Sequence, residues 1–132
     1  MNFALLVIAV VFISIAALFH VYIFTLESLT WTTPRTRKIF GVASQHEAET
    51  IKPMAFNQGF YNLFLGIGAA VGLVLLASIP AAGLALVFMG AGSMVLAALV
   101  LLLSSKSNRR SALIQGVPPL IGIVFVLLAL AL

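Results

Sequence analysis

The residues that could do chemistry in this chain of 132 residues are few, and most of them lie between positions 20 and 62. His20 and Glu27 are seven positions apart, which places two side chains on one face of a helix. A carboxyl group within an apolar helix can carry a proton or a cation, and a nearby histidine can change how strongly the carboxyl group holds it. The other candidates are aromatic and amide side chains that could orient a bound molecule: Trp31, Asn57, Gln58, Tyr61, Asn62 and Gln115.

Several common kinds of reactive site are absent from the sequence. It contains no cysteine, no phosphate-binding loop, no nucleophile elbow and no pair of histidines at the spacing of metal ligands. We therefore expect no metal and no cofactor, and these absences argue against an enzyme.

The residues around these polar side chains are overwhelmingly apolar. Hydrophobic residues make up 63% of the chain and charged residues 8%, and the mean hydropathy is +1.24. Soluble domains carry about 25% charged residues, and a soluble chain of this length could not bury so much apolar surface. The composition excludes a soluble enzyme, a nucleic-acid-binding module and a disordered tail, and it predicts an integral membrane protein.

Apolar stretches long enough to cross a membrane, about 20 residues each, set the expected architecture. They cover about 3–27, 54–78, 81–103 and 112–132. We predict an all-α fold, an integral membrane four-helix bundle forming a single transmembrane domain over residues 1–132. The intervening loop, 28–53, is amphipathic and predicts a short interfacial helix, because Thr33-Pro34 is typical of a helix start and Gly41 of a helix end.

Glycine pairs indicate where the predicted spans approach one another closely. Gly68 and Gly72 are four residues apart in the second span, and Gly90 and Gly92 lie in the third. Small residues at such positions allow helix backbones to pack together in a membrane.

The basic residues indicate the orientation of the chain. All seven lysines and arginines lie within 35–52 and 106–110, which are the first and third loops. The positive-inside rule then places both loops in the cytoplasm and both termini outside. We expect Arg35, Arg37 and Lys38 to contact anionic lipid headgroups at the cytoplasmic face of the bilayer, and we expect no nucleic-acid partner.

Four motifs give the sequence a family resemblance: His20-Val-Tyr-Ile-Phe-Thr-Leu-Glu27, Trp31-Thr-Thr-Pro34-Arg35, Lys38-Ile-Phe40-Gly41 and Asn57-Gln58-Gly59-Phe60-Tyr61-Asn62. With these motifs the chain resembles DUF1304, a group of small bacterial membrane proteins that has no established biochemical activity. The resemblance covers essentially the whole chain and is most specific from residue 20 to residue 62. It implies a four-span protein of the bacterial cytoplasmic (inner) membrane. It also implies that most of the candidate polar residues belong to the family's signature: His20, Glu27, Trp31, Asn57, Gln58, Tyr61 and Asn62.

The predicted topology brings the candidate polar residues into the cytoplasmic half of the bundle, where we expect them to face inward and pair. The favoured interpretation is that this polar cluster binds or transports a small molecule. One alternative is a structural or partner-binding protein without catalysis, in which Glu27 binds a nearby basic residue and the amides hold helices together. Another is an intramembrane enzyme that acts on a lipid-like substrate, with His20 and Glu27 as acid and base. Because four short spans barely enclose a pore, transport favours a homodimer.

Overall fold

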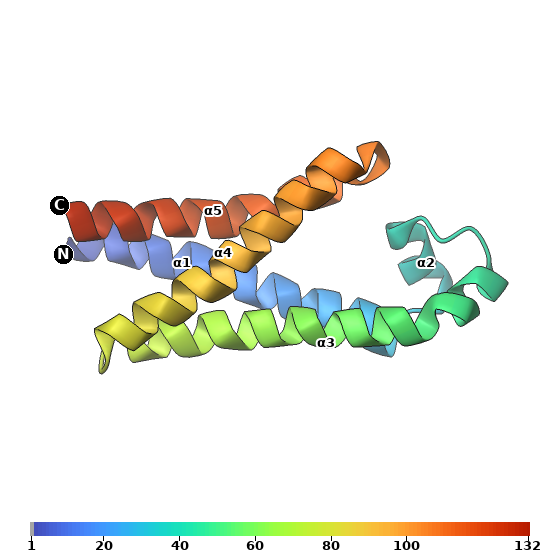
Figure 1. The fold of residues 1–132 in the computed structure, drawn as a ribbon, viewed down its shortest axis with the longest axis horizontal. Coiled ribbons are helices and arrows are strands. Elements are labelled where there is room, and N and C mark those ends of the chain that lie inside the picture. Colours follow the sequence, from blue (N-terminus) through green and yellow to red (C-terminus); the bar gives the residue numbers. More distant parts are fainter. Residues whose placement is uncertain (1) are drawn as a thin grey trace. The chain divides into compact units, whose positions relative to one another are not determined.

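The computed structural model describes residues 2–132, and all of the regular elements within that range are helices (Figure 1). The long and short α-helices are α1 (Phe3–Phe24), α2 (Pro34–Phe40), α3 (Gln45–Leu75), α4 (Pro80–Ser104) and α5 (Arg109–Ala131). A π-helix, Thr25–Leu29, directly extends α1, and a short 3-10 turn, Lys106–Asn108, precedes α5. The all-α prediction, including a short helix in the first loop, is confirmed.

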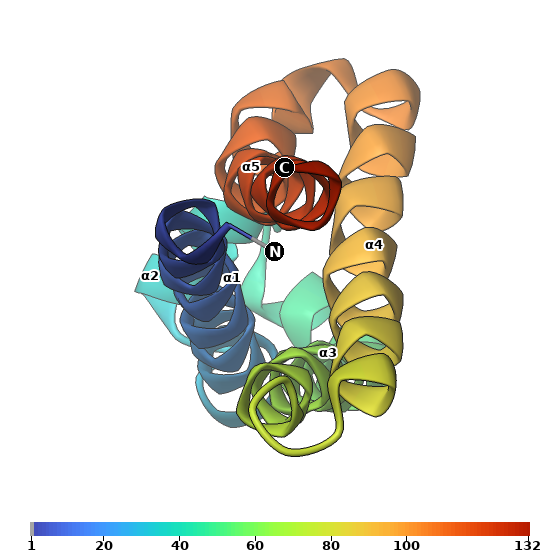
Figure 2. The same ribbon diagram turned by 90° about the vertical axis from the view of Figure 1, so that its left-hand side faces the viewer.

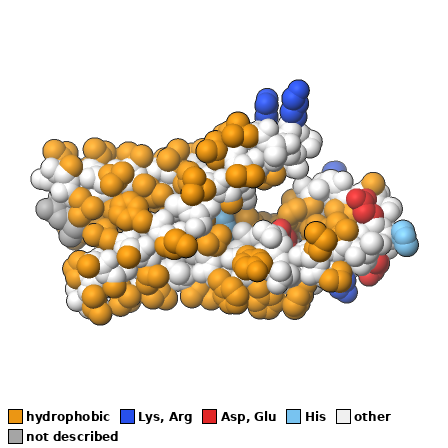
Figure 3. Space-filling model, viewed as in Figure 1, with side chains coloured by type: hydrophobic (Ala, Val, Ile, Leu, Met, Phe, Trp, Pro, Cys, Tyr) orange, Lys and Arg blue, Asp and Glu red, His pale blue; other side chains and the backbone are white. Residues whose placement is uncertain are grey.

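Four helical segments are long and apolar enough to cross a membrane: Phe3–Leu29, Gln45–Leu75, Pro80–Ser104 and Lys106–Ala131. Their flanks carry exposed apolar side chains, such as Leu96 and Leu127, where a soluble protein would carry charges. Figure 3 shows hydrophobic side chains along the helices, and lysine and arginine at the connection between α4 and α5 and around α2 and the start of α3. The chain is a multi-pass membrane protein.

The second long helix starts earlier than its apolar stretch. The sequence predicts a span from residue 54, but α3 begins at Gln45 and contains Pro53 in its interior. The reason is a local capping arrangement: Ser44 Oγ accepts from the Glu47 amide at 3.0 Å, and Glu47 Oε2 accepts from the Ala43 amide at 2.9 Å. The loop predicted over 28–53 is therefore largely helical.

The chain divides into two compact units, which are described separately. The larger unit contains residues 2–19 and Leu65–Leu132, and the smaller contains His20–Phe64. In the larger unit, α5 lies between α1 and α4, and the last part of α3 lies beside α4, across the bundle from α5 (Figure 2). Its core is a cluster of small and medium apolar side chains: Ala9, Ile13, Ala16, Ala17, Ala69, Val87, Met94 and Val126.

Glycines allow the helices of the larger unit to approach closely. A Cβ atom on Gly83 of α4 would lie 2.8 Å from the carbonyl oxygen of Gly72 on α3. A Cβ atom on Gly90 would lie 3.0 Å from the amide nitrogen of Ala69. The expected roles of Gly72 and Gly90 in close packing are thus confirmed.

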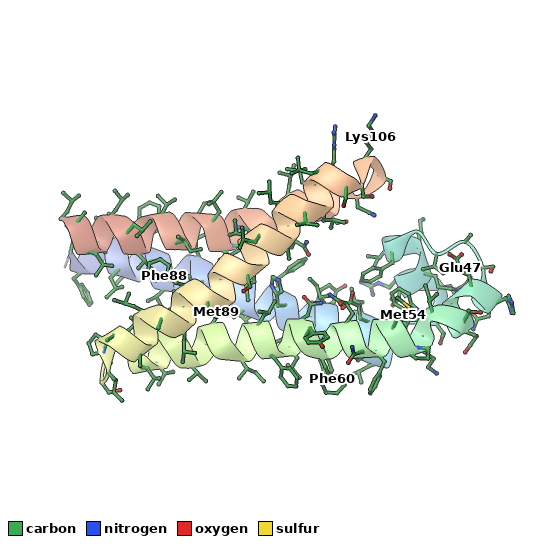
Figure 4. The ribbon with its side chains drawn as sticks, viewed as in Figure 1. Glu47, Met54, Phe60, Phe88, Met89 and Lys106 are labelled. Carbon is green, nitrogen blue, oxygen red and sulfur yellow. The ribbon has the colours of Figure 1, made fainter. Side chains whose placement is uncertain are left out.

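The other two glycines of the predicted pairs do not contribute to packing. A Cβ atom on Gly68 or on Gly92 would have nothing within 4 Å apart from its own helix. The prediction was wrong for these two because spacing along a helix does not reveal which face meets a neighbour. In Figure 4 the adjacent Phe88 and Met89 show how consecutive residues of α4 project in different directions, and Met89 is 71% exposed.

The short helix α2 belongs to the smaller unit and has the ends that its sequence predicts. Thr33 has an extended backbone and its side chain accepts a hydrogen bond from the Thr36 amide. Pro34 occupies the first helical position, and Gly41 ends the helix in the left-handed conformation with φ of 69°. These three residues delimit α2 through local chemistry alone.

Candidate functional site

The first long helix ends in a π-helix, and this irregular turn carries Glu27. The Thr30 amide donates to the Thr25 carbonyl at 3.1 Å, a bond across five residues instead of the usual four. The Thr25 hydroxyl in turn donates to the Tyr22 carbonyl at 2.7 Å. A π-helix is wider than an α-helix and changes the direction of the side chains within it, and such turns are frequent at functional sites.

Glu27 is buried, with 9% of the surface of the residue exposed. Its Oε2 atom accepts a hydrogen bond from the Asn62 side-chain nitrogen at 2.8 Å. The same nitrogen donates to the Gln58 carbonyl at 3.2 Å, one helical turn earlier on α3. Both bonds together hold the Asn62 amide in a defined orientation toward the acid.

Glu27 is not neutralised by the basic residues that follow it in the sequence. In the part of the chain that the structure describes, its carboxylate contacts an amide and forms no ion pair with Arg35, Arg37 or Lys38. All three of these residues lie on α2, where Arg35 and Lys38 are exposed and Arg37 is partly buried. The alternative in which Glu27 binds one of these residues was wrong, because the carboxylate turns toward Asn62 on α3.

Two residues that the sequence analysis missed bring the end of α1 against α3. The Ser28 hydroxyl donates to the Phe56 carbonyl at 2.8 Å. Gly59 is buried at this contact, where an added Cβ atom would run into Ser28 Oγ and lie 3.1 Å from Glu27 Cβ. The spacing of Ala55 and Gly59, two small residues one turn apart, is the signal that could have identified the contact.

The polar residues of α3 divide between two faces of the helix. Ala55 and Gly59 are buried, and Asn62 follows them at the spacing of a single helix face. Asn57, Gln58 and Tyr61 lie on other faces and are exposed, and Tyr61 is 59% exposed.

The expectation that all of the α3 polar residues turn inward was therefore wrong for three of them, Asn57, Gln58 and Tyr61. Neighbouring residues on a helix project about 100° apart. The two pairs that are one turn apart therefore cannot point the same way: Asn57 with Tyr61, and Gln58 with Asn62. Of the candidates on α3, only Asn62 has a side chain that contacts Glu27.

Aromatic rings also join the end of α1 to α3. Phe60, labelled in Figure 4, packs edge-to-face on Phe24 with ring centroids 5.0 Å apart. Phe56 lies 5.1 Å from Phe60 by the same measure. The contact between Phe24 and Phe60 adds an apolar contact between the end of α1 and α3.

Trp31 has a structural contact within the smaller unit. Its indole N–H donates to the Ala48 carbonyl at 3.1 Å, and its ring lies 5.1 Å from that of Phe40, between centroids. Only 8% of the side chain is exposed. Trp31 therefore joins the start of α3 to α2.

The last two candidates lie on different helices. His20 is buried near the end of α1, with 2% of its surface exposed. Because the π-helix changes the register after Phe24, the seven-residue spacing from His20 to Glu27 does not correspond to one regular helix face. Gln115 is partly buried on α5, in the larger unit.

Within residues 2–132 no three histidine, aspartate or glutamate side chains are grouped so as to hold a metal ion.

Comparison with known proteins identifies the family. The family profile described as protein of unknown function (DUF1304) matches residues 14–127. The chain belongs to this family. The matched region includes the π-helix, the Glu27–Asn62 pair and α2, so the resemblance inferred from the sequence motifs is confirmed. A search of curated proteins and a search of solved structures each returned no match.

Proposed function

We propose that this DUF1304 protein binds a small, positively charged molecule at Glu27. The observation that carries the proposal is a buried carboxylate, within a segment long enough to span a membrane, whose partner is a neutral amide. Acidic residues in such segments are costly and usually mark binding or ion pathways. A bound cation would supply the charge that the Asn62 amide does not.

The chemistry of the pair suits reversible binding. An ionised carboxylate can accept several hydrogen bonds, and Asn62 supplies one of them at Oε2. Protonation of Glu27 would release a cation, and loss of the proton would restore the site. Exchange of a proton for a cation is the elementary step of proton-coupled transport. We extend the binding proposal to transport of this kind.

The proposal includes an orientation and an assembly. We place the chain in the bacterial cytoplasmic membrane with both termini outside and both basic loops inside, following the positive-inside rule. The two ends of the chain lie together, since the Asn2 amide donates to the Ala129 carbonyl at 2.8 Å (Figure 1). This supports an even number of crossings. We propose a homodimer as the transporting unit, because four spans barely enclose a pore.

A binding measurement with a defined probe tests the proposal. Equilibrium dialysis of the purified chain in detergent would use tetraphenylphosphonium, a membrane-soluble monovalent cation. We expect saturable binding that falls as pH is lowered, and at least a tenfold loss of affinity in Glu27→Gln, which removes the charge but retains a hydrogen-bond acceptor. Glu49→Gln is the matched control, because Glu49 is an exposed acid on α3 that contacts Gln45.

The contrary result would be equal probe binding by Glu27→Gln and the unchanged protein, with both folded. Such a result would favour the alternative of a structural protein. One observation supports that alternative: the bonds from Asn62 to Glu27 and from Ser28 to Phe56 both hold the end of α1 against α3. In that case Glu27→Gln would alter the thermal unfolding temperature and leave every binding measurement unchanged.

A further inference from the structure

The turn between the first span and α2 contains a pocket with a cavity volume of about 260 Å³. Most of the residues around it carry a hydroxyl group on an otherwise apolar side chain, and the others are one arginine and one leucine: Tyr22, Thr25, Leu26, Thr30, Thr33, Arg35 and Thr36. Glu27 does not line this pocket. A cavity whose only charged side chain is an arginine, and whose other polar side chains are neutral hydroxyls, is suited to an anion.

The threonines form a connected hydroxyl network. Thr36 is 1% exposed, and its hydroxyl lies 3.0 Å from that of Thr30 and 3.1 Å from that of Thr33. The Thr33 hydroxyl also has the Thr30 carbonyl within 2.9 Å, and the Thr30 hydroxyl has a long contact of 3.3 Å with the Thr25 carbonyl. The Thr30 and Thr33 hydroxyls each have two acceptors in reach, so one of these protons can turn toward a bound anion while the remaining bonds hold the pocket together.

Arg35 is the cation of the pocket. It is exposed, and within the described residues no carboxylate forms an ion pair with it. A guanidinium group can bind two oxygens of a phosphate at once through its planar fork. Of the three basic residues expected to contact lipid headgroups, Arg35 alone lines the pocket, whereas Arg37 and Lys38 do not.

The position of the pocket along the chain matches the depth of lipid phosphates. The first membrane-crossing segment ends at Leu29, and the pocket is built from the last turns of that segment and the residues that follow it. Its volume lies just below the range of about 300–1,000 Å³ typical of sites for drug-sized ligands. It therefore suits a headgroup rather than an acyl chain.

We infer that this pocket binds a singly charged phosphate group, as in the phosphodiester of an anionic phospholipid. Arg35 holds two phosphate oxygens, and the threonine network contributes hydroxyl protons. The site is independent of the cation site proposed at Glu27, because the two share no residue.

Native mass spectrometry of the full chain in detergent tests the inference. Phosphatidylglycerol is titrated against the unchanged protein, Arg35→Gln and Arg110→Gln. Arg110 belongs to the other basic loop, so its variant is matched in charge. We expect one retained phosphatidylglycerol, a loss of affinity of at least tenfold in Arg35→Gln, and a change within about twofold in Arg110→Gln. Equal losses in the two variants would overturn the inference, because they would indicate general attraction between charges.

Two further measurements complete the test. Thr30→Val preserves the charge and approximate volume of the pocket, and we expect it to weaken binding severalfold with an unchanged helical circular dichroism spectrum. Unchanged affinity in a folded Thr30→Val protein would contradict the role of the hydroxyl network. Competition by glycerol 1-phosphate and by inorganic phosphate then distinguishes the source. Displacement would assign the pocket to phosphate groups in general, and retention of the lipid would assign it to the phospholipid. If the protein bound neither phosphatidylglycerol, glycerol 1-phosphate nor inorganic phosphate, the inference would be overturned.

Discussion

A hydrogen bond to a buried carboxylate contributes more to stability than the same bond at a wet surface, because water does not replace it when it is lost. The bond from Asn62 to Glu27 is of this kind. We predict that Asn62→Ala lowers the stability of the protein by about 1–3 kcal/mol. The measurement is the midpoint of thermal unfolding in detergent.

Asn57→Ala is the control for this prediction. Asn57 lies on the same helix but is exposed, and a change at such a position usually alters stability by less than about 0.5 kcal/mol. Equal shifts in the two variants would mean that the Glu27 contact contributes nothing specific. Combining Asn62→Ala with Glu27→Gln in a double-mutant cycle would then measure the interaction between the two side chains directly.

Gly59 provides the second test at the scale of single residues. Gly59→Ala would place a methyl group against Ser28 Oγ and near Glu27 Cβ, and we predict a loss of about 1–3 kcal/mol from this overpacking. Gly68→Ala, on the same helix with nothing within 4 Å, should instead be neutral or stabilising by up to about 1 kcal/mol. Both are measured by thermal unfolding.

The proposed cause of the Gly59 effect can be checked by rescue. Because the nearest obstacle is the Ser28 hydroxyl, Ser28→Ala should restore part of the stability lost in Gly59→Ala. If the two losses simply add, the clash with Ser28 is not the cause.

At the scale of elements, α2 is delimited by local caps and should respond to them independently of the rest of the protein. Gly41→Ala forces a side chain into the left-handed conformation at φ of 69°, which costs about 1–2 kcal/mol. We predict faster amide hydrogen exchange across α2 with little change in α4 or α5. Gly92→Ala, inside α4 and free of neighbouring atoms, should leave exchange in α2 unchanged. Faster exchange spread evenly over all the helices would contradict a local role for this cap.

The elements differ in how far the sequence could predict them. The ends of α2 were predictable because Thr33, Pro34 and Gly41 act on their own backbone. The predicted start of α3 was wrong because it was placed where the apolar stretch begins. Polar residues end a membrane span but not a helix, and Ser44 and Glu47 cap this helix nine residues earlier, before Gln45. The π-helix was not predicted, because the bond from the Thr30 amide to the Thr25 carbonyl widens a single turn by one residue. The apolar pattern of the sequence does not show such a local change.

At the scale of the whole molecule, the distribution of charge predicts a single orientation. All seven basic residues lie within 35–52 and 106–110, in the connections between spans and the adjoining helix ends, so both termini should be outside the cytoplasm. We predict that alkaline phosphatase, which is active only outside the cytoplasm, is active when fused after Leu132. A fluorescent protein that matures only in the cytoplasm should be dark at the same position. The reverse pattern would refute the orientation.

The sequence by itself determined that the chain crosses a membrane with four helices, since transfer into lipid depends on contiguous stretches of apolar residues and needs no partner. It also determined the short helix between the first two spans, because helix caps are local. Only the tertiary structure decided that Asn62 faces Glu27 while Asn57 and Gln58 are exposed. The reason is that the two partners are 35 residues apart, and their contact depends on the π-helix and on the close approach that Gly59 permits.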